Sequence, residues 1–236
     1  AAMITAMDEQ VGRVVAALEK KGIRDNTLIV FHSDNGGTKN KMFAGDGDVS
    51  KITIPVDNGP LRDGKGSLYE GGTRVVALAN WPGHIKAGSR VEGMMHVVDM
   101  YPTLLGIAGA KLGRNKPLDG MDVWTTISAG APSPRTEIVY NIEPFRAGVR
   151  EKDWKLIWRT PLPATMELYD IGTDPYEKKD VASEHPEIVA RLQKRANALA
   201  TEAQKPLLLE TEFKAMMERV KLPPAFPGDD ALFNAD

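Results

Sequence analysis

The chain has 236 residues, enough for one large domain or a domain with a smaller companion. Hydrophobic residues make up 42% and charged residues 26%, a globular balance that argues against long disordered tracts. The formal net charge is −2 with both signs spread along the chain, and the apolar runs are short, which argues against nucleic-acid binding and a membrane span. The absence of cysteine excludes disulfides, thiolate metal sites and cysteine nucleophiles.

An amphipathic helix pattern opens the chain. Apolar residues recur on one face across residues 2–21, and Gly22 supplies a C-terminal stop. No capping residue precedes this helix, because the chain begins Ala1-Ala2. Natural domains rarely begin inside a helix, so we expect this sequence to be the later part of a longer protein.

Two apolar runs lie on either side of a long polar segment. Residues 27–31 and 75–79 each predict a short strand that is buried on both faces. Residues 38–72 are rich in Gly, Asp and Lys with little periodicity, which predicts a long loop, either functional or disordered. A helix follows, with Asp99 as its N-cap and an end near Gly109. This order of helix, strand, loop, strand and helix predicts a layered α/β domain.

The composition changes after a stretch rich in Gly, Pro and Ser at residues 127–135, which predicts a domain boundary. Four turn-separated segments then predict an antiparallel sheet: residues 137–141, 147–151, 154–159 and 166–171. A helix over residues 185–204 and a Pro-rich tail, with one more short helix from Pro206, complete the chain. We therefore expect an α/β domain over residues 1–130 and a small α+β domain over residues 131–236.

Two polar side chains follow the first predicted strand. Asp34 and Asn35 come just after its carboxyl end, where α/β sheets commonly place their sites. A carboxylate and an amide carbonyl are hard ligands that suit Ca²⁺ or Mg²⁺ rather than zinc. Asp-Asn-Gly is also a good turn sequence, so both interpretations stay open on these residues alone.

One lysine stands in an unusually flexible setting. Lys65 lies between Gly64 and Gly66, where the backbone can approach a ligand closely. Such a lysine suits a tetrahedral oxyanion, whose developing charge it can stabilise. A surface lysine in a turn explains the same pattern. Glu70 and Arg74 nearby are equally consistent with a structural ion pair that holds this loop.

Several other known metal-binding and catalytic motifs do not match the residue spacing of this sequence. Residues 46–57 imitate an EF-hand, but Lys51 replaces the required glycine and Asp57 the final glutamate, so we interpret them as a solvated loop. The four histidines have no zinc-binding spacing. His96 precedes the second predicted helix and either faces the long loop or has a structural role. There is no G-x-S-x-G, P-loop or dinucleotide-binding motif at a strand–helix junction.

Taken together, these segments resemble one family. The chain contains, in the order seen in the C-terminal half of sulfatases, "DNTLIVFHSDNGG", "NGPLRDGKGSLYEGGTRV", "HVVDMYPTLLGIAG" and "LDGMDV". The resemblance covers about residues 1–122 and continues to residue 174 through "WKLIWR" and "MELYDIGTDPYE". It implies part of an α/β core of the alkaline phosphatase-like type, followed by a small C-terminal α+β subdomain with an antiparallel sheet and a helix. It also implies hydrolysis of sulfate esters at a calcium-bound formylglycine.

The resemblance also implies roles for particular residues. Asp34 and Asn35 correspond to two calcium ligands, and Lys65 to the catalytic lysine that contacts the sulfate group. A divalent cation and a lysine would neutralise the sulfate and polarise its oxygens during S–O cleavage. We further expect His96 to contact the substrate. Three more residues should support the site: Arg62, Glu70 and Arg74.

The family pattern is incomplete in this sequence. Sulfatases make their formylglycine nucleophile from the Cys or Ser of a C/S-x-P-x-R motif, whereas this chain has no cysteine and its Ser-Pro-Arg at residues 133–135 has the wrong spacing. The aspartates that complete the calcium shell and the upstream lysine and histidines are also missing, although calcium takes about six to eight oxygens. His32 stands where threonine or serine is commoner. We therefore expect a C-terminal sulfatase fragment that is inactive alone.

Two other functions remain open. The chain fits a non-catalytic binding or assembly module on the same fold, or part of a phosphate or phosphonate monoester hydrolase, because a metal and a lysine suit both esters. Strands with two buried faces would leave apolar surface and a free edge. Besides a sulfate ester substrate, the expected partner is therefore the missing N-terminal half or a second copy. Family analogy suggests a soluble periplasmic or secreted protein, although the sequence does not identify the compartment.

Overall fold

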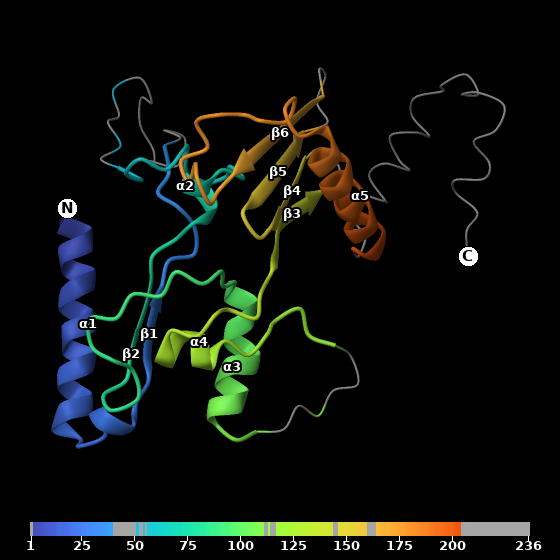
Figure 1. Cartoon of the computed structure of the whole chain (residues 1–236). Helices are drawn as coiled ribbons and strands as arrows, with labels where there is room; N and C mark the ends of the chain where they lie inside the picture. Colours follow the sequence, from blue (N-terminus) through green and yellow to red (C-terminus); the bar gives the residue numbers. More distant parts are fainter. Residues whose placement is uncertain are drawn as a thin grey trace, which may run out of the picture. The chain divides into compact units, whose positions relative to one another are not determined.

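The computed structural model describes residues 2–39, 51, 54, 56–110, 113, 117–143, 146–159 and 164–203 (Figure 1). The chain divides into two compact units, Ala1–Ala196 and Asn197–Asp236. The first unit holds all the described strands, and the described part of the second is the end of the last helix. The expected domain boundary near residue 130 stays a prediction, and the expected helix in the tail from Pro206 lies outside the described residues.

Helix α1 (Ala2–Lys20) forms as predicted. It ends at Gly22, which adopts a left-handed φ of 67° and closes the helix with a Schellman pair of backbone hydrogen bonds. No residue of this helix, which the structure describes completely, is buried. Its apolar side chains are open to solvent, with Met3 86% and Ile4 68% exposed. No helix in the described ranges is long and apolar enough to cross a membrane.

The first sheet has two antiparallel strands, β1 (Ile29–His32) and β2 (Ala77–Asn80), after a 3-10 turn η1 (Arg24–Asn26). Both predicted strands are present, each displaced by one or two residues. The prediction that they are buried on both faces is wrong for this chain, because Val30 is 40% and Leu78 is 62% exposed. These side chains and the face of α1 make up the open apolar surface that the sequence led us to expect.

Helix α2 (Glu70–Thr73) lies between β1 and β2. Three further helical segments lead from β2 to the second sheet: η3 (Val97–Asp99), α3 (Met100–Ile107) and α4 (Trp124–Ala129). Helix α2 falls inside the segment that we expected to be loop. Helix α3 ends at Ile107, close to Gly109 as predicted, and Asp99 directly precedes it in the predicted N-cap position, but its side chain makes no capping hydrogen bond to α3. His96 caps η3 by accepting the Val98 N–H, while the Asp99 side chain accepts the His96 N–H in a capping box.

The Asp99 side chain also has a role that the sequence did not suggest. It is fully buried and receives hydrogen bonds from Arg135 Nε (2.8 Å) and the Met121 N–H (2.9 Å). A second Arg135 nitrogen also binds it, so the pair is bidentate. This buried pair joins the start of α3 to the segment that leads into the second sheet.

Four antiparallel strands form the second sheet in chain order, as predicted: β3 (Glu137–Glu143), β4 (Arg146–Glu151), β5 (Trp154–Arg159) and β6 (Thr165–Asp170). The residues of a strand point alternately to opposite faces of its sheet. On one face, Leu156 packs in a cluster with Leu192 of helix α5 (Pro186–Glu202). On the other, Ile157 packs with Leu68 of the long loop. Both faces of β5 are therefore buried, one by a helix and one by the loop that carries Lys65.

Candidate functional site

A backbone junction brings the Lys65 loop beside Asp34 and Asn35. Gly36 donates its N–H to the Gly72 carbonyl oxygen (3.0 Å), and Lys65 donates its N–H to the Gly37 carbonyl oxygen (3.1 Å). Asp34 and Asn35 directly precede these glycines in the chain. The two segments predicted to form one site are thus joined by main-chain hydrogen bonds.

Missing side chains make this junction possible. A Cβ on Gly36 would collide with the Gly71 carbonyl oxygen, and a Cβ on Gly64 would collide with the Gly37 carbonyl oxygen. Gly64 therefore allows two backbones to pack closely, and the approach of a ligand that its sequence context suggested stays a prediction. Close backbone contact therefore explains why Gly36 and Gly64 lack side chains.

Asn58 completes the junction. Its Oδ1 accepts the Gly37 N–H (2.9 Å), and its Nδ2 donates to the carbonyl oxygens of Gly37 (3.0 Å) and Asp63 (2.9 Å). One side chain thus satisfies three backbone groups from two loops. Sequence reasoning did not single out Asn58, although it lies in the quoted motif "NGPLRDGKGSLYEGGTRV"; an asparagine before glycine is common in turns and attracts no notice by itself.

Asp34 and Asn35 carry the donor atoms for a cation. Asp34 is exposed, and the Asn35 amide nitrogen donates to the Gly36 carbonyl oxygen (3.0 Å), which leaves the amide oxygen as the ligand atom. Within the described part of the chain no group of three or more His, Cys, Asp or Glu residues could hold a metal. Because calcium takes about six to eight oxygens, the two residues fit part of a calcium site. The EF-hand-like segment lies mostly outside the described residues.

Lys65 stands at the tip of a turn that is held on both sides. Its side chain is exposed, and Gly66 next to it adopts a φ of 89°, which a residue with a Cβ rarely adopts. Arg146 of β4 donates from Nη1 to the Gly66 carbonyl oxygen (2.6 Å). The turn is thus attached to Gly37 on one side and to the second sheet on the other.

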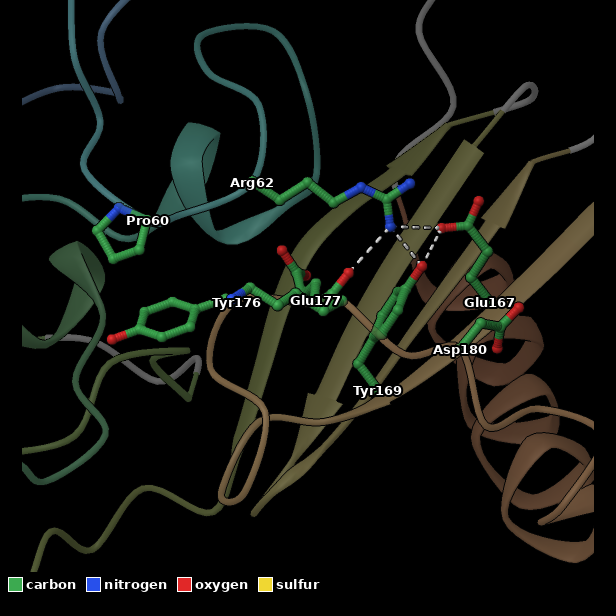
Figure 2. Close-up of a pocket in the computed structure, with 8 residues that line it drawn as sticks. Pro60, Arg62, Glu167, Tyr169, Tyr176, Glu177 and Asp180 are labelled. Atoms are coloured by element: carbon green, nitrogen blue, oxygen red, sulfur yellow. Dashed lines mark hydrogen bonds and ion pairs between the residues drawn. The ribbon is translucent and has the colours of Figure 1, made fainter.

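Arg62 reaches from the same loop to strand β6 (Figure 2). Its Nη1 donates to the Tyr169 hydroxyl (2.6 Å) and the Glu177 carbonyl oxygen (3.3 Å), and lies 3.6 Å from Glu167 Oε2. The guanidinium also lies 3.8 Å from the centre of the Tyr69 ring, a cation–π contact. Arg62 therefore connects the loop to the second sheet, as its expected supporting role requires.

A cavity of about 620 Å³ opens beside Arg62, lined by Pro60, Arg62, Glu167, Tyr169, Tyr176, Glu177, Lys178 and Asp180. Tyr69 and Tyr169 both donate to Glu167 Oε2 (2.6 Å each). Burial, and then the bond to Glu167, raise the pKa of Tyr69 to about 12 and also raise the pKa of Tyr169, so both hydroxyls stay protonated as donors. Several polar groups of this cavity pair with one another, as expected where the Arg62 loop packs against the second sheet.

A buried triad of charges lies behind the loop. Lys155 of β5, fully buried, places its Nζ 2.8 Å from Glu70 Oε1 and 2.9 Å from Glu177 Oε1. Glu177 Oε2 in turn accepts the Glu70 N–H (2.6 Å). The expected Arg74 partner is more distant, at 3.9 Å from Glu70 Oε2. Sequence reasoning missed Lys155 and Glu177; a lysine inside the apolar strand "WKLIWR" was the available signal.

His96 has a structural contact in this structure. Its Nδ1 accepts the Val98 N–H at 3.2 Å. Burial lowers the pKa of His96, and the nearby positive charges of Arg135 and His32 lower it further, while Asp99 opposes them. The predicted contact of His96 with substrate stays a prediction.

Two family models match the chain. One, described as sulfatase, matches residues 1–110; the other, described as N-sulphoglucosamine sulphohydrolase, C-terminal, matches residues 63–202. Lys65 lies in both matched ranges. The second range covers more than half of the chain and includes the whole second sheet.

Individual proteins show the same likeness. Arylsulfatase J of Mus musculus is 30% identical over 242 residues, which cover 83% of this chain and 38% of that protein. The crystal structure of Ps i-CgsB matches with a TM-score of 0.74 and 31% identity, over 99% of this chain and 49% of that one. The phosphonate monoester hydrolase of Agrobacterium radiobacter, at a TM-score of 0.56 and 23% identity over 85% of this chain and 40% of that one, shows the fold alone.

These matches confirm the alkaline phosphatase-like fold that the sequence predicted, of which the chain covers part. The chain spans less than half the length of each of these relatives. The matched ranges begin in α1 and extend through the second sheet into α5. The chain belongs to the sulfatase family.

Proposed function

We propose that the chain supplies one wall of a sulfatase active site, in which Lys65 contacts the sulfate group and Asp34 and Asn35 bind part of a calcium ion's shell. The observation that carries this proposal is the hydrogen bond from the Lys65 N–H to the Gly37 carbonyl oxygen (3.1 Å). It holds the lysine turn beside the two donor residues. The family match supports the same roles.

The chemistry of these residues suits a sulfate ester. The Lys65 ammonium is a compact charge with three donors, and its exposed side chain can bind sulfate oxygens and stabilise the charge that develops during S–O cleavage. A bound calcium ion would act as a Lewis acid on those oxygens. Asp34 and Asn35 hold and orient the cation in this proposal, and the backbone junction fixes their position relative to Lys65.

The nucleophile lies outside this chain in our proposal. The chain has no cysteine. Ser133, the serine of the Ser-Pro-Arg segment, donates to the Met94 carbonyl oxygen (2.5 Å), and its Oγ accepts the Arg135 N–H (3.2 Å). These contacts give Ser133 a structural role, which agrees with the wrong motif spacing. By itself the chain would bind part of a substrate without turning it over.

The part of the sulfatase fold that this chain does not span is the proposed partner. Several large apolar side chains are exposed on α1, β1 and β2: Met3, Ile4, Met7, Val11, Val14, Val30 and Leu78. Large apolar side chains exposed in such numbers commonly mark a surface that packs against protein. Because the chain covers 38% of arylsulfatase J and 49% of the Ps i-CgsB chain, we infer that the remaining part of such a fold covers it. A second copy of the chain is the alternative.

A sulfated saccharide is the proposed substrate class. Ps i-CgsB, 31% identical over 99% of this chain, was also solved in complex with k-i-k-neocarrahexaose, an oligosaccharide. The likeness to a phosphonate monoester hydrolase concerns the fold alone, and both family models name sulfohydrolases, so we prefer sulfate to phosphate esters.

Hydrolysis assays test this proposal. The isolated chain should not hydrolyse aryl sulfate, aryl phosphate or a sulfated saccharide, whereas the chain joined to the remaining part of a sulfatase should hydrolyse the sulfates. In that complete enzyme Lys65→Ala should reduce kcat by about 10² to 10³, while Lys86→Ala, an exposed lysine of another loop, leaves it unchanged. Turnover by the isolated chain, or an active Lys65→Ala enzyme, would contradict the proposed division of the site.

A further inference from the structure

The loop that bears Lys65 is attached to the second sheet by a buried ionic group. Lys155, Glu70 and Glu177 are 0%, 1% and 1% exposed. They come from three separate segments: Glu70 begins α2, Lys155 lies in β5, and Glu177 lies between β6 and α5. Breaking such a buried pair is strongly unfavourable because it leaves an uncompensated charge in the interior.

The surroundings of the triad are also defined. Lys155 Nζ lies 4.4 Å from the centre of the Tyr140 ring, and the Tyr140 hydroxyl donates to Glu70 Oε1 (3.5 Å). Burial, followed by the charge of Glu70, raises the pKa of Tyr140, whose hydroxyl therefore stays protonated. The other charged groups that act on this cluster are Arg74, near Glu70, and Arg150 of β4, near Tyr140. Lys155 is the cation closest to both carboxylates among these groups.

Main-chain contacts transmit the position of Glu70 to Lys65. Gly71, next to Glu70, donates its N–H to the Arg62 carbonyl oxygen (2.8 Å), and the Gly72 carbonyl oxygen accepts the Gly36 N–H (3.0 Å). A Cβ on Gly71 would collide with the Arg62 carbonyl oxygen, so these backbones are in close contact. A displacement of α2 must therefore displace the turn that holds Lys65.

We propose that the Glu70–Lys155–Glu177 triad clamps the Lys65 loop onto the second sheet, which makes Lys155 and Glu177 positioning residues for Lys65. The clamp itself rests on these contacts, and its consequence for catalysis rests on the proposed function of Lys65. In this proposal the second sheet positions Lys65 in the active site, although none of the residues of the sheet contacts the substrate.

The outer contacts of the loop are weaker anchors than the triad. Arg62 and Glu167 have 40% and 19% exposed side chains and lie 3.6 Å apart. Solvent and salt screen pairs of this kind. We therefore expect Arg62→Met to loosen the loop less than Lys155→Met.

Limited trypsin digestion measures the clamp directly, because Lys65 is itself a cleavage site. In Lys155→Met, cleavage after Lys65 should rise about tenfold relative to cleavage after Arg90, whose side chain is 83% exposed. Lys178→Met, which removes an exposed lysine next to Glu177, is the matched control and should change that ratio less than about twofold. Circular dichroism checks that each variant remains folded.

A pH series separates the ionic clamp from general stabilisation. Lys155→Met leaves two buried carboxylates facing each other, so burial and repulsion raise their pKa values and they take up a proton between them as the pH falls. Hydrogen exchange of residues 58–73, corrected for the chemical rate, should therefore regain protection in this variant between about pH 8 and about pH 5. Burial already raises the pKa of Glu177 in the wild-type chain, but the charge of Lys155 opposes it, so the wild-type chain should show a smaller gain than the variant.

Two results would overturn the clamp. One is a folded Lys155→Met chain whose Lys65 cleavage and loop exchange match the wild type; the other is lost protection that pH does not restore. Should Lys155→Met fail to fold, Glu177→Gln, which leaves the Lys155–Glu70 pair intact, must still raise cleavage after Lys65 relative to Arg90. Failure of the proposed function would appear only in hydrolysis assays and would leave these loop measurements unchanged.

Discussion

Lys65 and Gly37 are joined by a backbone hydrogen bond of 3.1 Å, in which the lysine N–H donates to the glycine carbonyl oxygen. This bond sets the distance between the proposed sulfate contact and the proposed calcium ligands two to three residues before Gly37. The position of the Lys65 turn therefore depends on main-chain packing, while the Lys65 side chain is exposed. Changes at the glycines should alter the site without removing any of its functional groups.

Gly36→Ala tests this dependence. The added methyl group would collide with the Gly71 carbonyl oxygen, which belongs to a backbone that cannot move without displacing α2. We expect a loss of about 1–3 kcal/mol in the free energy of unfolding, measured by urea denaturation. Gly12→Ala is the control, because it lies in helix α1 with open space around it and should gain up to about 1 kcal/mol. A Gly36→Ala chain as stable as the wild type would contradict the close contact.

Asp34→Ala tests the proposed cation ligands. The isolated chain should bind Ca²⁺ weakly in a calorimetric titration. Calcium takes about six to eight oxygen ligands, and these two residues supply only part of them. Asp34→Ala should abolish this binding, since the carboxylate carries the only formal charge of the pair. Asp8→Ala, on the exposed helix α1, should leave the titration unchanged. Equal binding by all three chains would reject Asp34 as a ligand.

Leu168→Ala tests the core that supports the second sheet. Leu168 is fully buried in the cluster with Leu156 and Leu192, so truncation removes apolar contacts and leaves a cavity. The expected loss is about 2–5 kcal/mol in the free energy of unfolding. Met166→Ala, two residues earlier on β6 and 39% exposed, should cost less than about 1 kcal/mol. Similar losses for the two variants would contradict the described packing of β6 against α5.

His96 should make stability depend on pH. Burial and two nearby positive charges depress its pKa in the folded chain, so the unfolded chain binds more protons. The contribution is complete above the ordinary histidine pKa of about 6.5 and is lost as the pH falls toward the folded-state value. Urea midpoints from neutral to mildly acid pH should fall more steeply for the wild type than for His96→Asn, which keeps a capping acceptor but does not titrate.

His84→Asn is the control for this titration. His84 packs against Trp81 with ring centres 4.0 Å apart and lies outside the capping box of η3. Its loss should leave the steep fall between neutral and mildly acid pH in place. Identical pH profiles for wild type and His96→Asn would show that His96 does not titrate differently in the folded chain.

Local patterns predicted most secondary structure correctly because they act over a few residues. Periodicity and Gly22 predicted α1, and alternating strand composition predicted the four strands of the second sheet. Asp99 was assigned as an N-cap by residue type and does precede α3, but its side chain makes no capping bond to that helix and instead binds Arg135, 36 residues away in the chain. Propensity cannot detect such a distant competitor.

The candidate site divides in the same way. Asp34, Asn35 and Lys65 were singled out from short motifs, and main-chain hydrogen bonds between their neighbouring residues bring the two segments together, although their roles stay predictions. Asn58 and Lys155 were not found, because an asparagine in a turn and a lysine in a strand are ordinary in sequence. Only their partners in space distinguish them.

By itself, the sequence determined the family, the order of the strands and the longer helices, and the candidate site residues, because motifs and periodicity are local. Tertiary structure decided what holds the Lys65 loop. Lys155 meets Glu70 across 85 residues of chain, and the Glu70 N–H meets Glu177 across 107. Buried charges need partners at about 3 Å in a low-dielectric interior, and only folding brings residues so far apart within that distance.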